Sequence, residues 1–191
     1  FYLNSSIMGE LHDLDWLNQH VGEDEEVSIR NVTDEMAILA VSGPSARDLL
    51  QPLTAADLSN DSFPWLTGQE IEIAGVSCVA LRVSYVGELG WEFHHPIDQM
   101  INLYTALIDS GATYNLSHYG SYAMNSMRIE KAYKAWGSEL TTEITPIEAR
   151  LERFIDLSRN FLGSDVVNER KSEKLDMVLV YCEVETNDTD C

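Results

Sequence analysis

One carboxylate in this sequence, Glu92, stands between two large aromatic residues, Trp91 and Phe93, just after a turn that contains two glycines. A buried charge costs several kcal/mol unless it is paired, so this position has two interpretations. In the first, Glu92 lies on an edge hairpin and contacts water. In the second, it faces a pocket and accepts two N–H donors from the flat edge of a ligand such as an aminopteridine. Sequence spacing leaves both open.

The residues around Glu92 are expected to form two strands joined by a turn. Large apolar residues alternate with smaller or polar ones from 78 to 85, which predicts a strand with one apolar face. The two glycines that follow permit backbone angles that other residues resist, so they predict a turn. In the next strand, the alternation places both aromatic neighbours of Glu92 on one face, and Glu92 and His94 on the other.

The remaining elements predict an α+β fold with mixed or antiparallel sheets and packed helices. Hydrophobic periodicity predicts strands at residues 1–7, 27–32, 36–41, 69–74, 78–85, 91–94, 154–157 and 175–184. It predicts helices at 10–21, 44–53, 97–111, 117–135, after position 145, and at 165–173. The unbroken apolar run at 36–41 is typical of a central strand that is covered on both faces.

Two of these helices carry further signals. In the helix at 117–135, residues that recur at spacings of four and three predict a packing stripe, formed by Tyr122, Ser126, Ile129, Tyr133 and Trp136. The run TPIE at 145–148 predicts a helix start. There, Thr145 caps the helix, Pro146 takes the first helical position and Glu148 reaches back to the N–H of the cap residue.

The chain is strongly acidic, with 32 Asp and Glu residues against 12 Lys and Arg residues and a formal net charge of −20. The negative electrostatic field of such a chain repels phosphate backbones, so nucleic acid is excluded as a partner. A hydrophobic content of 45% supports a core. No run of about 18 apolar residues occurs, so no membrane span is expected. The length of 191 residues fits one domain or one and a half.

The three cysteines, Cys78, Cys182 and Cys191, show no metal-ligand spacing, and the histidines show neither a triad nor a metal pattern. Buried reduced thiols are the simplest interpretation, and they imply a reducing compartment. Five N-x-S/T triplets, the last at Asn187, are interpreted as chance because nothing else indicates secretion. The chain opens at Phe1 without a signal or transit segment, so we expect a piece of a longer or processed chain.

The run YVGELGWE at 85–92 resembles the Y-x-G-E-x-G-x-E element of the folate-binding T-protein family. This family includes the aminomethyltransferase of glycine cleavage and the C-terminal halves of dimethylglycine and sarcosine dehydrogenases. Four further runs are similar to its dehydrogenase branch, and most of all to dimethylglycine dehydrogenase: LHDLDW at 11–16, NVTDE at 31–35, SGPSAR at 42–47 and HYGSYAMNSMRIEKAYKAWG at 118–137. The resemblance extends from about the first residue to near Cys182.

The resemblance implies a folate site to which five residues of this chain contribute. Glu92 would take the amino edge of the pterin, and Tyr85 would pack on the ring or hydrogen-bond to it. Phe93 and His94 would line the same wall. Arg153 stands where the family has a tyrosine after the T-P-x-E helix start, and an arginine there can stack on a ring or meet the folate carboxylates.

Two further features bear on the branch and on the ligand. The aminomethyltransferase branch has an arginine where Met124 stands here, which favours the dehydrogenase branch. Arg128, Lys131 and Lys134 form a basic cluster in a chain that is poor in bases. This cluster is either a solvated helix face, with Lys134 paired to Glu130 at i, i+4, or a landing site for the polyanionic tail of a folate.

For the whole protein, the resemblance implies a flavin domain with FAD that lies N-terminal to these residues. Residues 1–174 would be an N-terminally truncated folate-binding domain, and 175–191 the first strand of a truncated C-terminal barrel. The parent enzyme would oxidise an N-methyl group of dimethylglycine, and this domain would capture the one-carbon unit as 5,10-methylenetetrahydrofolate. This chain alone would be inactive. The implied location is the mitochondrial matrix or a bacterial cytoplasm.

The partners implied are therefore a small-molecule folate and the flavin domain of the same parent chain. Four alternatives stay open: the folate domain of a sarcosine dehydrogenase, that of an aminomethyltransferase, a non-catalytic regulatory subunit of pyruvate dehydrogenase phosphatase, and a generic α+β module without a ligand. Affinity for folate separates the regulatory subunit from the enzymes.

Overall fold

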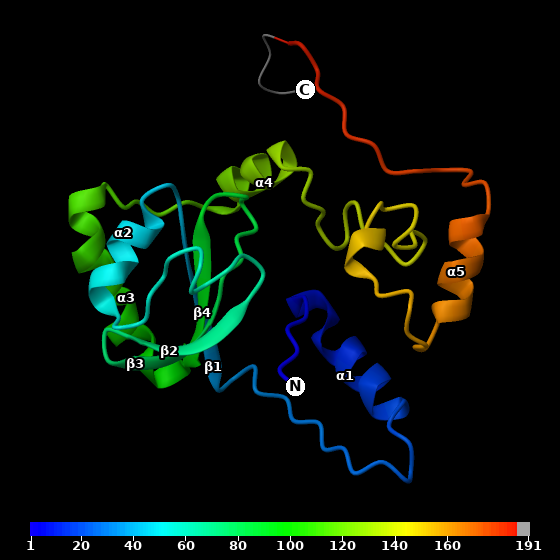
Figure 1. Cartoon of the computed structure of the whole chain (residues 1–191), viewed down its shortest axis with the longest axis horizontal. Helices are drawn as coiled ribbons and strands as arrows, with labels where there is room; N and C mark the ends of the chain where they lie inside the picture. The colour runs from blue at the N-terminus through cyan, green and yellow to red at the C-terminus, as the bar shows by residue number, and fades with distance from the viewer. Residues whose placement is uncertain (187–191) are drawn as a thin grey trace. The chain divides into compact units, whose positions relative to one another are not determined.

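Four β-strands form one antiparallel sheet, and this sheet carries Glu92. In the computed structural model, which describes residues 1–186, the strands are β1 (Met36–Ser42), β2 (Gly68–Ile73), β3 (Val76–Leu81) and β4 (Gly90–Pro96). Their order is β1-β4-β3-β2, so β4 lies between β1 and β3 (Figure 1). The predicted α+β fold with an antiparallel sheet is confirmed.

The chain divides into two compact units, and each is described here by itself. The first unit, Phe1–Lys131, contains the whole sheet, and the second begins at Ala132. The helical elements are η1 (Ile7–Gly9), α1 (Glu10–Gln19), α2 (Ala46–Leu50), η2 (Gln51–Leu53), η3 (Ile97–Gln99), α3 (Met100–Gly111), η4 (Ala112–Tyr114), α4 (Ser121–Glu130), η5 (Glu152–Phe154) and α5 (Ser164–Ser172). The predicted boundary at 174 stays a prediction, and residues 187–191, with Asn187 and Cys191, lie outside the described part.

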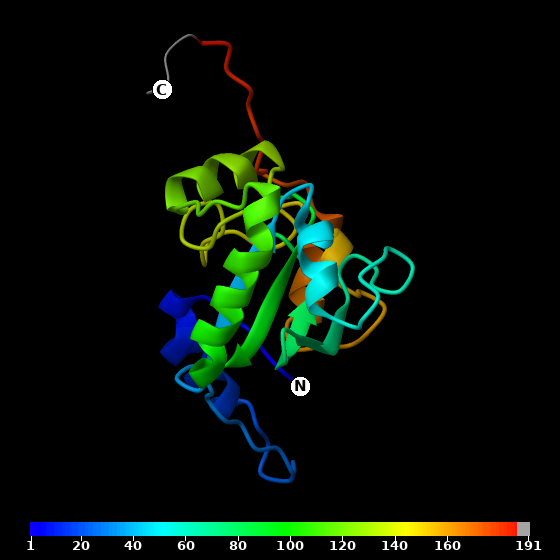
Figure 2. The same cartoon turned by 90° about the vertical axis from the view of Figure 1, so that its left-hand side faces the viewer.

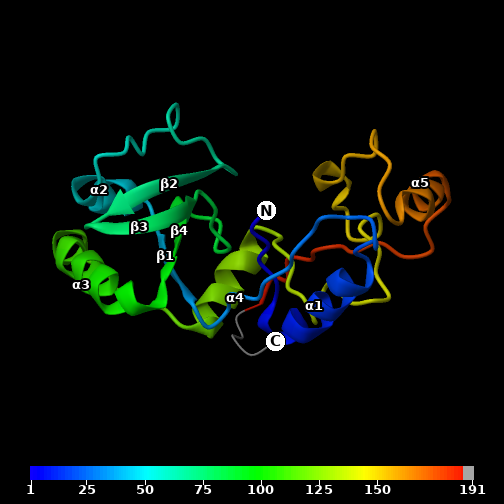
Figure 3. The same cartoon turned by 90° about the horizontal axis from the view of Figure 1, so that it is seen from below.

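The helices α2 and α3 cover one face of the sheet. Figure 2 shows α3 in front of the strands, and Figure 3 shows both helices on the same side. Trp91 and Phe93 of β4 are fully buried beneath them, together with Leu103 and Leu107 of α3. Each such side chain contributes about 1.5–3 kcal/mol on leaving water, so this layer is the principal source of stability for the first unit.

Two arginines hold the loop at 54–67 against this core. Arg47 donates from Nε to the carbonyl oxygen of Leu58 at 2.8 Å, and both Arg47 and Arg82 donate from Nη2 to Oδ1 of Asn60 at 2.7 Å. Their guanidinium carbons lie 5.7 and 5.6 Å from the centroid of the Trp91 ring, within cation–π range. Burial, and then the charge of Arg47, lowers the pKa of Arg82.

Two strand predictions near Glu92 need correction. The run at 36–41 forms β1, but β1 is an edge strand with an alternating burial pattern, not a central strand covered on both faces. The strand predicted at 78–85 ends at Leu81. The reason is local, because the N–H of Val83 bonds to the carbonyl oxygen of Leu81 and turns the chain out of the ladder.

Four other predicted strands are wrong. Residues 1–7, 27–32, 154–157 and 175–184 are irregular or form short 3₁₀ turns in the part of the chain that the structure describes. A strand needs a partner ladder for its N–H and C=O groups. Within residues 1–186, the strand ladders lie in the four-stranded sheet, and one isolated bridge joins Trp136 and Leu140 outside it. The helices predicted at 10–21, 97–111 and 165–173 are confirmed as α1, α3 and α5.

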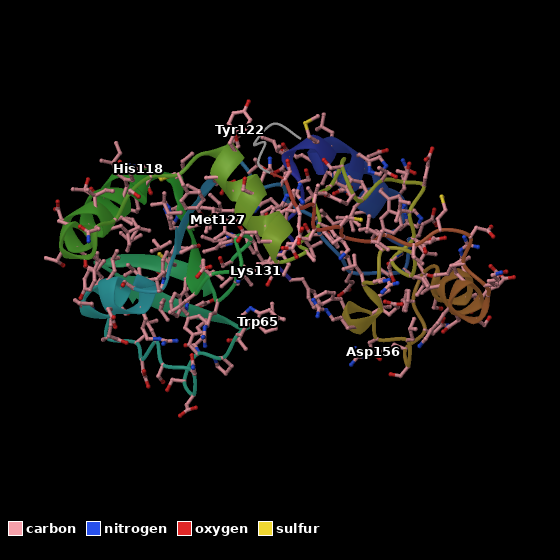
Figure 4. All side chains as sticks on the ribbon, turned by 90° about the horizontal axis from the view of Figure 1, so that it is seen from above. Trp65, His118, Tyr122, Met127, Lys131 and Asp156 are labelled. Carbon is pink, nitrogen blue, oxygen red and sulfur yellow. The ribbon has the colours of Figure 1, made fainter. Side chains whose placement is uncertain are left out.

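The helix predicted at 117–135 is shorter, and its packing stripe is wrong. The helix α4 ends at Glu130, and Ala132 at φ 57° breaks the helical path. Tyr122 is 91% exposed and points outward in Figure 4. The side chain that this helix buries instead is Arg128, so the face opposite to the predicted one packs inward.

In the second unit, the predicted capping chemistry at 145–148 is confirmed but the helix does not continue. The backbone N–H of Thr145 donates to Oε2 of Glu148 at 2.8 Å, and its hydroxyl donates to the same oxygen. Oε1 of Glu148 accepts from Nε of Arg170 on α5 at 2.7 Å. Arg150 then adopts φ 55°, which ends the turn. The hydrogen bond from the Thr145 hydroxyl, followed by those from Arg170, lowers the pKa of Glu148 to about 2.

The turn before Glu92 depends on glycine at position 87, which generates a first prediction. Gly87 has φ 74°, and a β-carbon there would overlap Cγ of Lys131 at the end of α4. We expect Gly87→Ala to lower the free energy of unfolding more than Gly75→Ala does. Gly75 has φ 81° with no atom near its β-carbon position, so Gly75→Ala costs the backbone strain alone, about 1–2 kcal/mol.

Thermal or urea unfolding of the two variants measures the difference, which we expect to be roughly 1 kcal/mol or more because of the overlap. Adding Lys131→Ala to Gly87→Ala removes the colliding carbons and should bring the cost near that of Gly75→Ala. Equal costs for the two single substitutions would show that Lys131 does not pack on this turn.

The hydrogen bonds that Glu148 accepts from Thr145 and Arg170 lead to a prediction about the pH dependence of stability. The pKa of Glu148 is lower in the folded state, from 4.5 to about 2, so its stabilisation is complete above about pH 4.5 and disappears as the pH falls through about 2. Arg170→Met raises this folded-state pKa. The free energy of unfolding should then depend less on pH across that window, and NMR titration of the Glu148 carboxyl carbon should report the shift. Arg159→Met, which removes an exposed pair with Asp156, should leave both unchanged.

Candidate functional site

Glu92 lies in the middle of β4 with its side chain directed away from the core. It stands opposite Ala40 of β1 and Leu81 of β3, and its side chain is 25% exposed. Its Oε2 lies 3.7 Å from Nε2 of His94. Within residues 1–186 the structure gives this carboxylate no lysine or arginine partner. Glu92 is thus neither fully solvated nor neutralised by a cation.

The sheet face around Glu92 is mixed in character. In the ladder, Glu92 shares a row with Ala40 and Leu81, and His94 shares the next row with Ile38 and Val79. We call these six residues the Glu92 face. Strand alternation turns this face away from Trp91 and Phe93. An apolar surface with one carboxylate suits a flat, mostly apolar ring that carries N–H donors on one edge.

His94 is fully buried on the same face. Its Nδ1 lies 3.0 Å from the hydroxyl oxygen of Tyr2, and the two rings meet edge to face at a centroid distance of 5.4 Å. Its Nε2 is buried without a hydrogen-bond partner among the described residues. Sequence reasoning missed Tyr2, since no local pattern connects two residues that stand 92 positions apart.

The other residues predicted for the site have different surroundings. Tyr85 is 37% exposed and lies in the turn that precedes β4. Phe93 is fully buried in the core cluster, so its side chain is on the opposite side of the sheet from Glu92. Arg153 belongs to the second unit, where its guanidinium carbon lies 4.7 Å from the ring centroid of Phe154. The structure therefore brings together Glu92 and His94, and adds Tyr2.

A shallow hollow of about 420 Å³ lies elsewhere in the first unit, between residues 52–56 and the edge strand β2, with Glu70 and Glu72 on its rim. None of the residues predicted for the site lines it. Among residues 1–186, no group of three or more His, Cys, Asp or Glu side chains is placed to hold a metal ion. No helix in this part of the chain is long and apolar enough to cross a membrane.

Comparisons with known proteins assign this chain to a family. Residues 1–159 match the GCVT N-terminal domain. Mitochondrial dimethylglycine dehydrogenase from Homo sapiens is 39% identical over 193 residues, which cover 100% of this chain and 22% of that protein. Aminomethyltransferase from Thermoanaerobacter sp. (strain X514) is 35% identical over 188 residues, covering 98% of this chain and 50% of that protein.

Mitochondrial sarcosine dehydrogenase from Mus musculus is 36% identical over 155 residues, covering 80% of this chain and 17% of that protein. This chain therefore spans between about a sixth and a half of the length of these relatives. A solved heterotetrameric sarcosine oxidase from Corynebacterium sp. U-96 aligns over 56% of this chain and 53% of its own, with a TM-score of 0.48 and 20% identity.

The family match covers most of the chain and includes both the Y-x-G-E-x-G-x-E element and the Glu92 face. The family predicted from the sequence motifs is thus confirmed. This chain belongs to the GCVT N-terminal domain family, the folate-binding, aminomethyltransferase-like domain that is also found in dimethylglycine and sarcosine dehydrogenases.

Proposed function

We propose that this chain is the tetrahydrofolate-binding part of a dimethylglycine dehydrogenase-like enzyme. In that role it captures the one-carbon unit from oxidative N-demethylation as 5,10-methylenetetrahydrofolate. Family membership supports the folate, and the similarity to dimethylglycine dehydrogenases over the full chain supports the branch. The amine substrate and the oxidation belong to the rest of the natural protein, where we expect a flavin domain with FAD.

The observation that carries this proposal is the state of Glu92. A carboxylate that is three-quarters shielded from water and has no cationic partner among the described residues pays a desolvation cost. A ligand edge with two adjacent N–H donors offsets this cost through charge-assisted hydrogen bonds. The amino edge of a pterin is such an edge, so the residues present fit the ligand.

Within this domain, the protein's own contribution is binding and positioning. Glu92 fixes the edge of the heterocycle, the apolar residues of the Glu92 face support the ring, and Tyr85 is placed at the turn that enters β4. Bound tetrahydrofolate supplies the nitrogen atoms that accept the one-carbon unit. Holding the reactants in register and apart from water accounts for much of the rate enhancement in reactions of this kind.

Two features support our assignment of this chain to the dimethylglycine dehydrogenase branch of the family. Identity is 39% with the dimethylglycine dehydrogenase, against 36% with the sarcosine dehydrogenase and 35% with the aminomethyltransferase. Met124 takes the place of an arginine of the aminomethyltransferase branch. The proposed location is the mitochondrial matrix or a bacterial cytoplasm, in keeping with the mitochondrial and bacterial relatives.

Glu92→Ala in the full natural protein tests the proposal. We expect the free energy of tetrahydrofolate binding to weaken by about 2–4 kcal/mol, because the N–H donors of the ligand lose their charged acceptor. Isothermal titration calorimetry measures this directly. The matched control is Glu72→Ala, which removes an exposed carboxylate from the edge strand β2 and should leave the affinity unchanged. An unaltered affinity in Glu92→Ala would exclude this site.

Lys131 offers a test of the anionic tail. Its stem packs on Gly87 in the turn that precedes β4, and Figure 4 shows it at the end of α4. We expect Lys131→Glu to weaken the binding of polyglutamylated tetrahydrofolate severalfold more than that of the monoglutamate, because the new negative charge repels each added carboxylate of the tail. Lys171→Glu on α5 serves as the control. Equal weakening of both ligands by Lys131→Glu would assign this lysine to a solvated helix face.

A further inference from the structure

Three residues of the first unit form a polar chain that ends at Glu92. We propose that Tyr2 and His94 are positioning residues for Glu92: the Tyr2 hydroxyl fixes the tautomer of His94, and the Nε2–H of His94 orients the Glu92 carboxylate toward the ligand. This inference rests on the proposed function for its ligand. Its structural part, the tautomer of His94, stands without any ligand.

The three side chains lie next to one another in the order Tyr2, His94 and Glu92. The hydroxyl oxygen of Tyr2 lies 3.0 Å from Nδ1 of His94, and Nε2 on the other side of the same ring lies 3.7 Å from Oε2 of Glu92. The second distance exceeds that of a hydrogen bond, and Nε2 has no other partner among the described residues. The nearest charged group to this buried nitrogen is therefore the carboxylate of Glu92.

The position of Nε2 distinguishes it from other unpaired polar atoms. Two more buried nitrogens lack partners in the described part of the chain, Nε1 of Trp91 and Nε2 of His95. By strand alternation both residues point to the core side of β4. His94 alone of the three is directed to the Glu92 face, so its unpaired nitrogen is the one that lies beside the Glu92 carboxylate.

Electrostatics selects one tautomer of His94. A neutral imidazole carries its proton on only one nitrogen. With the proton on Nδ1, the buried lone pair of Nε2 would face the negative charge of Glu92. With the proton on Nε2, the N–H dipole points at the carboxylate, and Nδ1 accepts from the Tyr2 hydroxyl. The second arrangement pairs Nδ1 with the Tyr2 hydroxyl and directs the Nε2–H at the Glu92 carboxylate, so the Tyr2 bond and the orientation of Glu92 depend on each other.

This arrangement determines which ligands fit. Oε2 of Glu92 faces an N–H group of the protein, so the remaining lone pairs of the carboxylate point to the ligand side. A ligand edge with two adjacent N–H donors, such as an aminopyrimidinone or an amidine, is complementary to it. An analogue that presents acceptors there leaves the carboxylate unpaired and is rejected. The His94 side chain thus acts on specificity through Glu92 and needs no direct contact with the ligand.

The tautomer is tested first, without ligand. In the full natural protein labelled with 15N-histidine, NMR shifts of the ring nitrogens should identify His94 as the Nε2–H form, and Tyr2→Phe should give a mixture of forms. Tyr104→Phe is the matched control, because it removes a similar bond, 2.9 Å from the hydroxyl oxygen to Nε2 of His118, away from Glu92. An Nδ1–H form of His94 in the unaltered protein would overturn the proposal.

Binding is tested second. Tyr2→Phe keeps the ring contact and should weaken tetrahydrofolate about fivefold to tenfold, as expected for the loss of one supporting hydrogen bond, while Tyr104→Phe should not. His94→Gln, which retains a side-chain N–H donor, should bind better than His94→Leu. If Glu92→Ala weakens binding and Tyr2→Phe does not, the positioning role is wrong and the folate site stands. If Glu92→Ala has no effect, the proposed function itself fails.

Discussion

The alternation of side chains along β4 is the constraint on which the rest of this structure depends. Trp91 and Phe93 are fully buried in the core that α2 and α3 cover, and this packing sets which face of the strand points inward. β1 pairs with β4 along its whole length, and β3 pairs with it from the other side. A slip by one residue would place Glu92 in the core and both aromatics outside. Core packing therefore holds Glu92 on its face more firmly than the preceding turn could.

Local patterns predicted this part of the fold well, because the information is contained in neighbouring residues. The period of two at 91–94 needs only the strand itself, and the division of Trp91 and Phe93 from Glu92 and His94 follows from it. The helices α1, α3 and α5 and the hairpin of β2 and β3 were likewise readable from periodicity and turn residues. Capping at Thr145 was also correct in its chemistry.

The errors share a non-local cause. Residues 1–7 have the composition of a strand, but a strand exists only when another backbone lies beside it, and the sequence does not state which segments pair. The same holds for the run at 36–41, whose apolar residues do not reveal that only one neighbour, β4, is present. In α4, a single residue with positive φ, Ala132, ends the helix and removes the register on which the predicted stripe depended.

The candidate site was predictable only in part for the same reason. Glu92 and His94 are two residues apart on one strand, so the sequence placed them together, whereas Tyr2 reaches them through the tertiary fold. Arg153 was assigned by family likeness, and no local pattern supports or opposes that assignment. A constellation of this kind can be listed from a motif, but its geometry depends on long-range pairing.

Buried polar groups have different surroundings on the two faces of β4, and this difference connects stability with function. On the core side, Arg47 and Arg82 share the amide oxygen of Asn60, and each also bonds to a backbone carbonyl of the adjoining loop. Two other nitrogens on that side, Nε1 of Trp91 and Nε2 of His95, lack a partner among the described residues. Both residues are fully buried in the packed layer, where a ligand does not reach them. On the Glu92 face, a carboxylate without a cation and an imidazole nitrogen without a partner remain. Groups left in this state destabilise the fold. Stabilisation from the core side offsets that cost, which is how a folded domain can keep a polar site ready for a ligand.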